Sequence, residues 1–327
     1  MRRIWFVALA SLSLVSVGRP YLVRAQSADS IRDIVHIANT YQLVSNITYR
    51  KVSNWDAKLD IYQPRGLKAP SPTVMYFHGG GWTNGAKEGA AFSLLPYLQM
   101  GYTVVNVEYR LTDVAPAPAA VEDARCALRW IYRNAKPYNF DTTKIVTTGN
   151  SAGGHLALIT GMLPGSSELD LTCPGDRAGG ASNPGSNNTD PLKVAAIVDW
   201  YGITDVNELL SGPNRRSWAV AWLGAMPTRD AVARMVSPLT YVKAGIPPMI
   251  SVHGDADPTV PYAQKTRLHD ALQKAGLPHE LVTIPNGRHG GFTDAQNLKA
   301  YTAIRAFLSK YNLPTLTPDE AAHYSSR

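Results

Sequence analysis

Short apolar runs rich in β-branched residues alternate with helical patterns along most of this 327-residue chain. Several runs show no alternation of polar and apolar residues, which is typical of strands buried on both faces of a parallel sheet. We expect strands at residues 47–52, 59–62, 73–77, 103–107, 144–148, 195–200, 249–252 and 281–284. The main helical patterns cover residues 119–134, 152–162, 262–274 and 294–310. The sequence therefore predicts an α/β domain in which helices flank a mostly parallel, eight-stranded sheet.

Two segments interrupt the alternation. The first, residues 163–192, is rich in Gly, Ser, Asn and Pro, which predicts a long surface loop. The second, residues 203–245, contains short helical stretches with Trp218 and Trp222 and lies between two expected strands. We expect this second segment to form a small lid.

The N-terminal residues indicate an export signal. Two arginines precede an apolar run over residues 4–17, and Val23-Arg24-Ala25 has the small residues of a cleavage site. A retained membrane anchor is the alternative, but the run is shorter than the roughly 20 apolar residues that a spanning helix needs. We expect export to the periplasm or the medium, with no stable membrane insertion after cleavage. We divide the chain into a signal at residues 1–25, a lead-in at 26–45, a domain at 46–312 and a tail at 313–327.

The charge balance excludes nucleic acid as an expected partner. The chain has 32 basic and 25 acidic side chains, and four of the arginines lie in the expected signal. Removal of the signal leaves 28 basic side chains and a net charge near +3, without any long Lys/Arg run.

The two cysteines, Cys126 and Cys173, can form one disulfide in an exported protein. We favour the disulfide, while two buried free thiols are the alternative. No metal-ligand spacing such as His-Glu-x-x-His occurs in the sequence, so we expect neither a metal ion nor another cofactor.

Residues 149–153 read Gly-Asn-Ser-Ala-Gly, which is the pattern Gly-x-Ser-x-Gly. The pattern lies directly between an expected strand and an expected helix, where a tight turn would lift the Ser151 hydroxyl above the sheet edge. This placement predicts that Ser151 is a nucleophile. Chance alone would give such a triplet in about one protein in ten of this length, so the motif needs support from the rest of the chain.

A glycine run follows the expected strand that ends at residue 77. Residues 78–82 read His-Gly-Gly-Gly-Trp, and successive glycines let backbone N–H groups approach a ligand closely, as an oxyanion hole requires. A flexible turn is the alternative. A dinucleotide loop does not fit, because the spacing Gly-x-Gly-x-x-Gly and a later acidic residue are missing.

Two further motifs follow the last two expected strands. Residues 253–258 read His-Gly-Asp-Ala-Asp-Pro, where Asp257 is the predicted acid and Asp255 is the alternative, more suited to capping a turn. Asp205 is a weaker candidate. His289, among glycines on the next loop, is the predicted base, and the chain order Ser, Asp, His is the one used by hydrolases with the Gly-x-Ser-x-Gly turn.

The other seven histidines are expected to be structural. We expect His78 to brace the glycine run, His253 to support the acid turn, and His155 to lie inside the helix after Ser151.

These motifs, together with Leu-Asp-Ile-Tyr at residues 59–62 and Tyr-Arg-Leu at 109–111, resemble the α/β-hydrolase esterase and lipase families over residues 45–312. The branch that the chain resembles most is that of bifunctional feruloyl and acetyl-xylan esterases (BD-FAE-like). The long loop at residues 163–192 departs from the pattern and leaves the shape of the substrate pocket open.

The resemblance implies an α/β-hydrolase fold and an esterase site. Ser151, Asp257 and His289 would form a catalytic triad, and the amides of Gly80, Gly81 and Ala152 would form the oxyanion hole. The implied activity is serine carboxylic-ester hydrolysis through an acyl-enzyme, on a small-molecule or polysaccharide-linked ester such as an acetyl or feruloyl ester of plant polysaccharide.

Two alternatives remain for the activity, and one for the pocket. A serine peptidase or amidase of the prolyl-oligopeptidase-like type would use the same groups, and a hydrolase-fold binding protein would have lost catalysis. Four aromatic residues are candidate pocket walls, although core packing is their alternative role. They are Trp82, Tyr201, Trp218 and Trp222.

Overall fold

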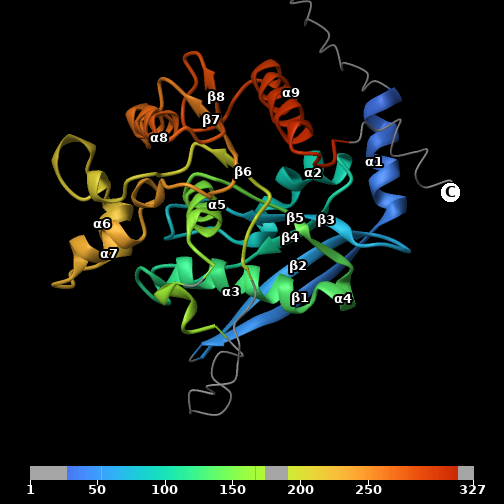
Figure 1. Ribbon diagram of the computed structural model, residues 1–327, viewed down its shortest axis with the longest axis horizontal. Coiled ribbons are helices and arrows are strands. Elements are labelled where there is room, and N and C mark those ends of the chain that lie inside the picture. The colour runs from blue at the N-terminus through green and yellow to red at the C-terminus, as the bar shows by residue number, and fades with distance from the viewer. Residues whose placement is uncertain (1–27, 53, 166, 174–190, 316–327) are drawn as a thin grey trace, which may run out of the picture.

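One eight-stranded sheet forms the centre of the computed structural model, which describes residues 28–52, 54–165, 167–173 and 191–315 (Figure 1). The strands are β1 (Tyr41–Val52), β2 (Trp55–Pro64), β3 (Ser71–Phe77), β4 (Thr103–Val107), β5 (Phe140–Asn150), β6 (Ala196–Trp200), β7 (Met249–Gly254) and β8 (His279–Ile284). Their order across the sheet is β1-β2-β4-β3-β5-β6-β7-β8. β2 runs antiparallel to β1 and β4, whereas the pairs from β4 to β8 are parallel. The carboxyl ends of β3 and of β5 to β8 therefore meet at one edge.

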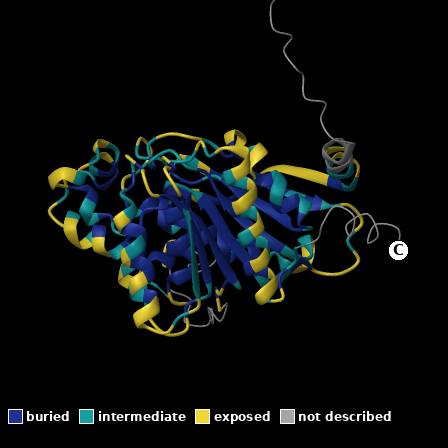
Figure 2. Ribbon diagram, turned by 90° about the horizontal axis from the view of Figure 1, so that it is seen from above, coloured by how far each residue is buried: buried dark blue, intermediate teal, exposed yellow. Residues whose placement is uncertain are grey.

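Helices cover both faces of the sheet. α3 (Ala119–Arg133), α5 (Ala152–Met162) and α8 (Tyr262–Lys274) share a hydrophobic core with one face, and α2 (Leu95–Gln99) and α9 (Asp294–Lys310) share a second core with the other. The structure also contains α1 (Ala28–Thr40), α4 (Ala135–Tyr138), α6 (Ser217–Leu223) and α7 (Arg229–Met235). Figure 2 shows the strands buried between helices whose outer sides are exposed. The predicted fold class is confirmed.

The burial of α3 and α5 follows from the elements that pack around them. α3 buries most of its residues, including the charged Asp123, Arg125 and Arg129, because α5, β1 and the turn at residues 168–170 all pack against it. α5 is buried along its whole length, since it packs against strands β5 and β6 on one side and against α3 on another.

The first strands extend beyond the hydrophobic patterns that predicted them. β1 begins at Tyr41 rather than at residue 47, and α1 and the first half of β1 occupy the expected lead-in. Most side chains in that half of β1 are exposed, so no apolar pattern marks it, and its pairing with β2 defines it instead. β5 likewise begins at Phe140, four residues before the predicted start at 144.

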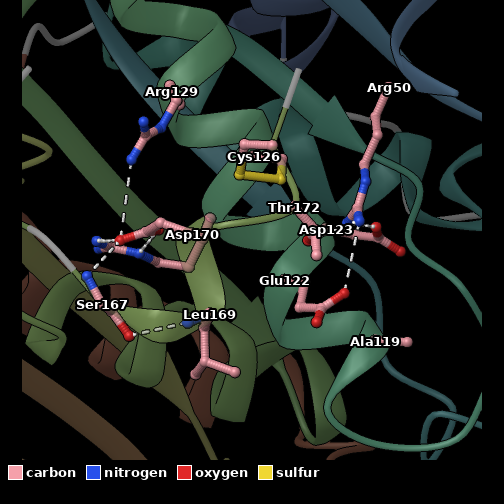
Figure 3. Close-up of a disulfide and its surroundings, with 12 residues drawn as sticks. Arg50, Ala119, Glu122, Asp123, Cys126, Arg129, Ser167, Leu169, Asp170 and Thr172 are labelled. Carbon is pink, nitrogen blue, oxygen red and sulfur yellow. Dashed lines mark hydrogen bonds and ion pairs between the residues drawn. A yellow bond between two sulfur atoms is a disulfide. The ribbon is translucent and has the colours of Figure 1, made fainter. Parts of the chain in front are cut away.

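The segment after α5 is attached to α3 by covalent and ionic bonds (Figure 3). The structure joins Cys126 of α3 to Cys173 in a disulfide. The Arg125 guanidinium binds both carboxylate oxygens of Asp170, at 2.8 and 2.9 Å. An Arg50 guanidinium N–H donates to the hydroxyl of Thr172 at 2.8 Å. Residues 174–190 of the predicted long loop lie outside the described residues.

The expected lid segment carries α6, α7 and short 3-10 turns between β6 and β7. It is anchored at its base, because the Arg216 guanidinium donates to the carbonyl oxygens of Pro258 at 2.9 Å and Thr259 at 2.8 Å. The loop after β7 and the lid are therefore tied together next to Asp257.

The proposed export signal lies outside the described residues, and so do residues 316–327 of the tail. Within the part of the chain that the structure describes, no helix is both long enough and apolar enough to cross a membrane.

Candidate active site

Ser151 lies on a strained turn between β5 and α5. Its backbone has φ 55° and ψ −120°, a conformation that costs on the order of 1–3 kcal/mol for a residue with a side chain. The turn is held on both sides, because the Ser151 amide donates to the carbonyl of Trp200 at 2.9 Å and its carbonyl accepts from the amide of His155 at 3.0 Å. A Cβ atom at Gly153 would overlap the carbonyl oxygen of Phe77, so the close packing of α5 on β3 requires a glycine there.

The structure brings Ser151, His289 and Asp257 together in series. Nδ1 of His289 lies 2.7 Å from Oδ2 of Asp257, and Nε2 lies 2.7 Å from Oγ of Ser151. An ionised carboxylate only accepts hydrogen bonds, so the His289 proton lies on Nδ1. Nε2 therefore accepts the hydrogen bond from the serine hydroxyl.

Asp257 accepts hydrogen bonds on both oxygens. Oδ1 takes the backbone N–H groups of Thr259 at 2.7 Å and Val260 at 3.0 Å. Burial by itself raises the pKa of Asp257, but the hydrogen bonds from His253, His289 and the Thr259 amide outweigh it and hold the pKa below its usual range. The carboxylate therefore stays ionised throughout the neutral range.

His253 is a second imidazole on the same carboxylate. It is fully buried, and its Nε2 lies 3.1 Å from Oδ2 of Asp257 and 3.1 Å from the carbonyl oxygen of Val260. Both neighbours are acceptors, so the His253 proton lies on Nε2. Sequence reasoning gave His253 a supporting role in the acid turn, but its direct contact with the carboxylate had no signal in the sequence.

The other two candidate acids lie elsewhere. Oδ1 of Asp255 accepts the backbone N–H of Asn286 at 2.7 Å, which fits the expected turn-capping role. Oδ1 of Asp205 accepts the amide of Asn207 at 3.1 Å, and its other oxygen lies 3.7 Å from the Arg267 guanidinium. Among the candidates, Asp257 is the carboxylate that contacts His289.

The glycine run presents unused amides beside Ser151. Gly80 and Gly81 have φ values of 123° and 60°, and both line the same cavity as the serine. Ala152 is the first residue of α5, where amides lack a partner within the helix. Among the described residues, the amides of Gly80, Gly81 and Ala152 donate no hydrogen bond to protein.

His78 braces this glycine run. Its ring stacks on Tyr109 at 4.4 Å, and its Nδ1 lies 2.7 Å from the carbonyl oxygen of Gly79. The Tyr109 hydroxyl in turn donates to the carbonyl of His78 at 2.8 Å.

A cavity of about 520 Å³ opens above Ser151 and His289. Tyr201 and Trp218 line it, as the sequence analysis expected. Trp82 and Trp222 do not line it, and the expectation for these two is wrong. They are fully buried and stack on each other at 3.9 Å, with the His155 ring edge-on to both.

The described residues contain no group of three or more His, Cys, Asp or Glu side chains placed to hold a metal ion.

A comparison with models of protein families identifies the family of this chain. The BD-FAE family model matches residues 59–272, which is more than half of the sequence. The chain belongs to the BD-FAE family. It is also 29% identical over 242 residues to the esterase LipQ of Mycobacterium tuberculosis, a match that covers 71% of this chain and 53% of LipQ. The chain thus spans about half the length of the curated relatives that it matches.

Solved structures with a similar fold include esterases. A truncated form of a carbohydrate esterase from gut microbiota is 28% identical, with a TM-score of 0.69 over 83% of this chain and 97% of that one. The apo form of esterase 2 from Thermogutta terrifontis is 27% identical, with a TM-score of 0.68 over 85% of this chain and 97% of that one. Both neighbours have the α/β-hydrolase architecture described above.

Proposed function

We propose that this BD-FAE protein is a serine carboxylic-ester hydrolase that works through an acyl-enzyme. The observation that carries the proposal is the unbroken series of two 2.7 Å contacts from Asp257 to His289 to Ser151. Three loops far apart in the chain supply these side chains at the carboxyl edge of the sheet. The esterases among its relatives support the ester class.

The reaction begins when Nε2 of neutral His289 takes the proton of the Ser151 hydroxyl as Oγ attacks the ester carbonyl. The Oγ–carbon bond forms and the carbonyl oxygen becomes negatively charged. His289 then gives the proton to the departing alcohol oxygen as the ester bond breaks. Water repeats the sequence and releases the acid, while Asp257 holds the Nδ1 proton and stabilises the imidazolium.

The amides of Gly80, Gly81 and Ala152 stabilise the negative oxygen in this proposal. Each such donor contributes roughly 10² to 10³ in rate, because it is already oriented in a site that excludes much of the water. Backbone groups cannot be removed by substitution, so changes at the two glycines act by moving the loop.

For the substrate and location, we propose acetyl or feruloyl esters of plant polysaccharide and export to the periplasm or the medium. The carbohydrate esterase among the structural neighbours and the family support the substrate class. A screen of acetylated xylan, methyl ferulate and p-nitrophenyl esters of increasing chain length tests it. N-terminal sequencing of protein from the culture medium or periplasm tests export, with Gln26 expected as the first residue.

The test of the proposed activity is Ser151→Ala, assayed with p-nitrophenyl acetate. Turnover and labelling by a fluorophosphonate probe should both disappear while the circular dichroism spectrum is unchanged, because a small residue replaces a small one. Ser309→Ala is the matched control, because Ser309 is an exposed residue in the last turn of α9 and does not line the cavity. Wild-type turnover in Ser151→Ala would refute the nucleophile. Faster cleavage of a matched anilide than of the ester would favour an amidase instead.

A further inference from the structure

The glycine run beside Ser151 has side chains only at its two ends. Residues 79–81 are all glycine, so they offer no side chain through which packing could hold their amides in place. His78 at the start and Trp82 at the end are the nearest side chains that can do so. Because His78 is braced as described above, the placement of Trp82 controls the end of the run next to Gly81.

The backbone at Trp82 is strained and needs support. Its φ is 59°, in the left-handed region that residues with a side chain rarely adopt, and such a conformation persists only where the surrounding structure holds it. The Trp82 carbonyl oxygen accepts the amide of Thr112 at 2.9 Å and the hydroxyl of the same residue at 3.0 Å. These bonds hold the carbonyl, and the indole ring provides the second point of attachment.

The lid helix α6 holds the Trp82 indole. The ring is fully buried and stacks on Trp222, with the ring centroids 3.9 Å apart and the planes 13° apart. Trp218, one turn earlier on the same helix, lies 5.5 Å from Trp82. A Cβ atom at Gly81 would lie only 3.2 Å from Cγ of Trp218. α6 therefore packs directly on the end of the glycine run.

α6 is itself fixed near both ends. Arg216, directly before the helix, ties it to the loop after β7 through the two hydrogen bonds described above. Near the other end, the amide of Ala117 donates to the Trp222 carbonyl at 2.8 Å. Trp222 is therefore a fixed support on which the Trp82 ring rests.

The same aromatic cluster connects the glycine run to the nucleophile helix. His155 of α5 lies edge-on to Trp82 at 4.9 Å and to Trp222 at 5.5 Å. α5 begins with Ala152, which supplies the third amide of the proposed oxyanion hole. Because these amides come from two separate segments, their spacing depends on contacts between the segments, and this cluster provides such a contact.

We propose that Trp222 is a positioning residue, which acts through Trp82 to hold the amides of Gly80 and Gly81 at the working distance from the Ala152 amide. The inference rests on the proposed ester hydrolase function and adds to it a role for the lid helix. Trp222 is fully buried and does not line the cavity, so it has no surface with which to bind substrate. Its loss should therefore weaken transition-state stabilisation and leave substrate binding little changed.

The test is Trp222→Leu, with Trp222→Met as a second variant that fills more of the space if the first does not fold. Both remove the stacked ring. We expect kcat for p-nitrophenyl acetate to fall at least about tenfold and KM to stay within about threefold, because displaced amides lose part of the roughly 10² to 10³ that each contributes. Trp222→Phe keeps an aromatic ring against Trp82 and should retain kcat within about threefold.

A transition-state analogue separates this role from general packing. Ser151 Oγ adds to the carbonyl carbon of trifluoroacetone, its proton moves to Nε2 of His289, and the carbonyl oxygen becomes an oxyanion, which the proposed amides would bind. In the Trp222→Leu and Trp222→Met variants, Ki for trifluoroacetone should rise by about the factor by which kcat/KM falls.

Trp130→Leu is the matched control, measured in parallel with thermal unfolding of every variant. Trp130 lies on α3, packs on Tyr138 and Phe140, and does not line the cavity. Its replacement should lower the melting temperature and leave kcat and Ki within about twofold of the wild-type values.

Three results would overturn the inference. They are a folded Trp222→Leu or Trp222→Met variant with kcat within about threefold of wild type, a loss of kcat with unchanged Ki, and an equal loss in Trp130→Leu. Each leaves ester hydrolysis and fluorophosphonate labelling of the wild-type protein intact, so the proposed function stands. Wild-type protein that cleaves no ester and resists the probe would refute the proposed function instead.

Discussion

Replacement of Asp257 by Asn tests whether this carboxylate keeps the His289 proton on Nδ1. The wild-type carboxylate accepts four hydrogen bonds, two from the backbone on Oδ1 and two from imidazoles on Oδ2. An asparagine has one oxygen and one NH₂ group in place of the two oxygens. In either orientation, the asparagine NH₂ group points at N–H groups that the carboxylate oxygen accepted. The hydrogen bonds there are lost unless an imidazole changes its tautomer and becomes the acceptor.

The two orientations have different consequences. With NH₂ in place of Oδ1, it faces the amides of Thr259 and Val260, and two hydrogen bonds are lost. With NH₂ in place of Oδ2, Nδ1 of His289 must become an acceptor, and the proton moves to Nε2. Nε2 can then no longer accept the serine proton, and in triads of this kind the corresponding substitution lowers kcat by about 10⁴. That factor corresponds to about 5.5 kcal/mol in activation free energy.

The assay is hydrolysis of p-nitrophenyl acetate at neutral pH, with kcat and KM measured separately. Asp257→Asn should lower kcat by about 10⁴ and change KM little, because the carboxylate does not contact the substrate. Asp255→Asn is the matched control two residues away, since its carboxylate only accepts an amide of the neighbouring turn. We expect it to retain kcat within about threefold.

Two results would refute this reasoning. One is an Asp257→Asn variant that keeps more than about a tenth of the wild-type kcat, because the tautomer argument would then fail. The other is an Asp255→Asn variant that is impaired more than Asp257→Asn while its thermal unfolding is unchanged.

Three further predictions concern stability. Burial lowers the pKa of His155 to about 4, so between pH 6.5 and 4 the unfolded chain binds a proton there that the folded protein does not. The contribution of His155 to the free energy of unfolding should be fully present above pH 6.5 and fall by about 3 kcal/mol toward pH 4. Urea titrations of His155→Gln should therefore show a smaller fall than those of the wild-type protein. Reduction of the disulfide should lower the melting temperature by about 5–10 °C. A thiol titration that finds two free thiols confirms the reduction, and an unchanged melting temperature in that sample would contradict the prediction. Gly153→Ala should cost several kcal/mol in thermal unfolding and most of the activity, because its methyl group would overlap the carbonyl oxygen of Phe77. Gly89→Ala, where the methyl group would meet open space, should leave thermal unfolding unchanged.

The sequence predicted the fold class because apolar runs without alternation mark buried parallel strands. The site followed from the same pattern, since residues placed directly after parallel strands meet at one edge of the sheet. Ser151, Asp257 and His289 each lie within a few residues of a strand end, so their meeting needed no knowledge of side-chain packing.

The pocket walls could not be predicted in the same way. Trp218 and Trp222 are four residues apart on α6, yet the first lines the cavity and the second is fully buried. The difference arises because Trp222 packs against Trp82 and against His155 of α5, which no local pattern encodes.

The two imidazoles on Asp257 explain why the site is already aligned before any substrate binds. A buried carboxylate with few donors would gain a proton and lose its hold on Nδ1 of His289. His253 and the two backbone amides stabilise the ionised form, and His253 reaches nothing beyond Asp257 and Val260 among the hydrogen-bond partners that the described residues offer it. One imidazole therefore fixes the carboxylate, so that the other keeps its free lone pair directed at the Ser151 hydroxyl.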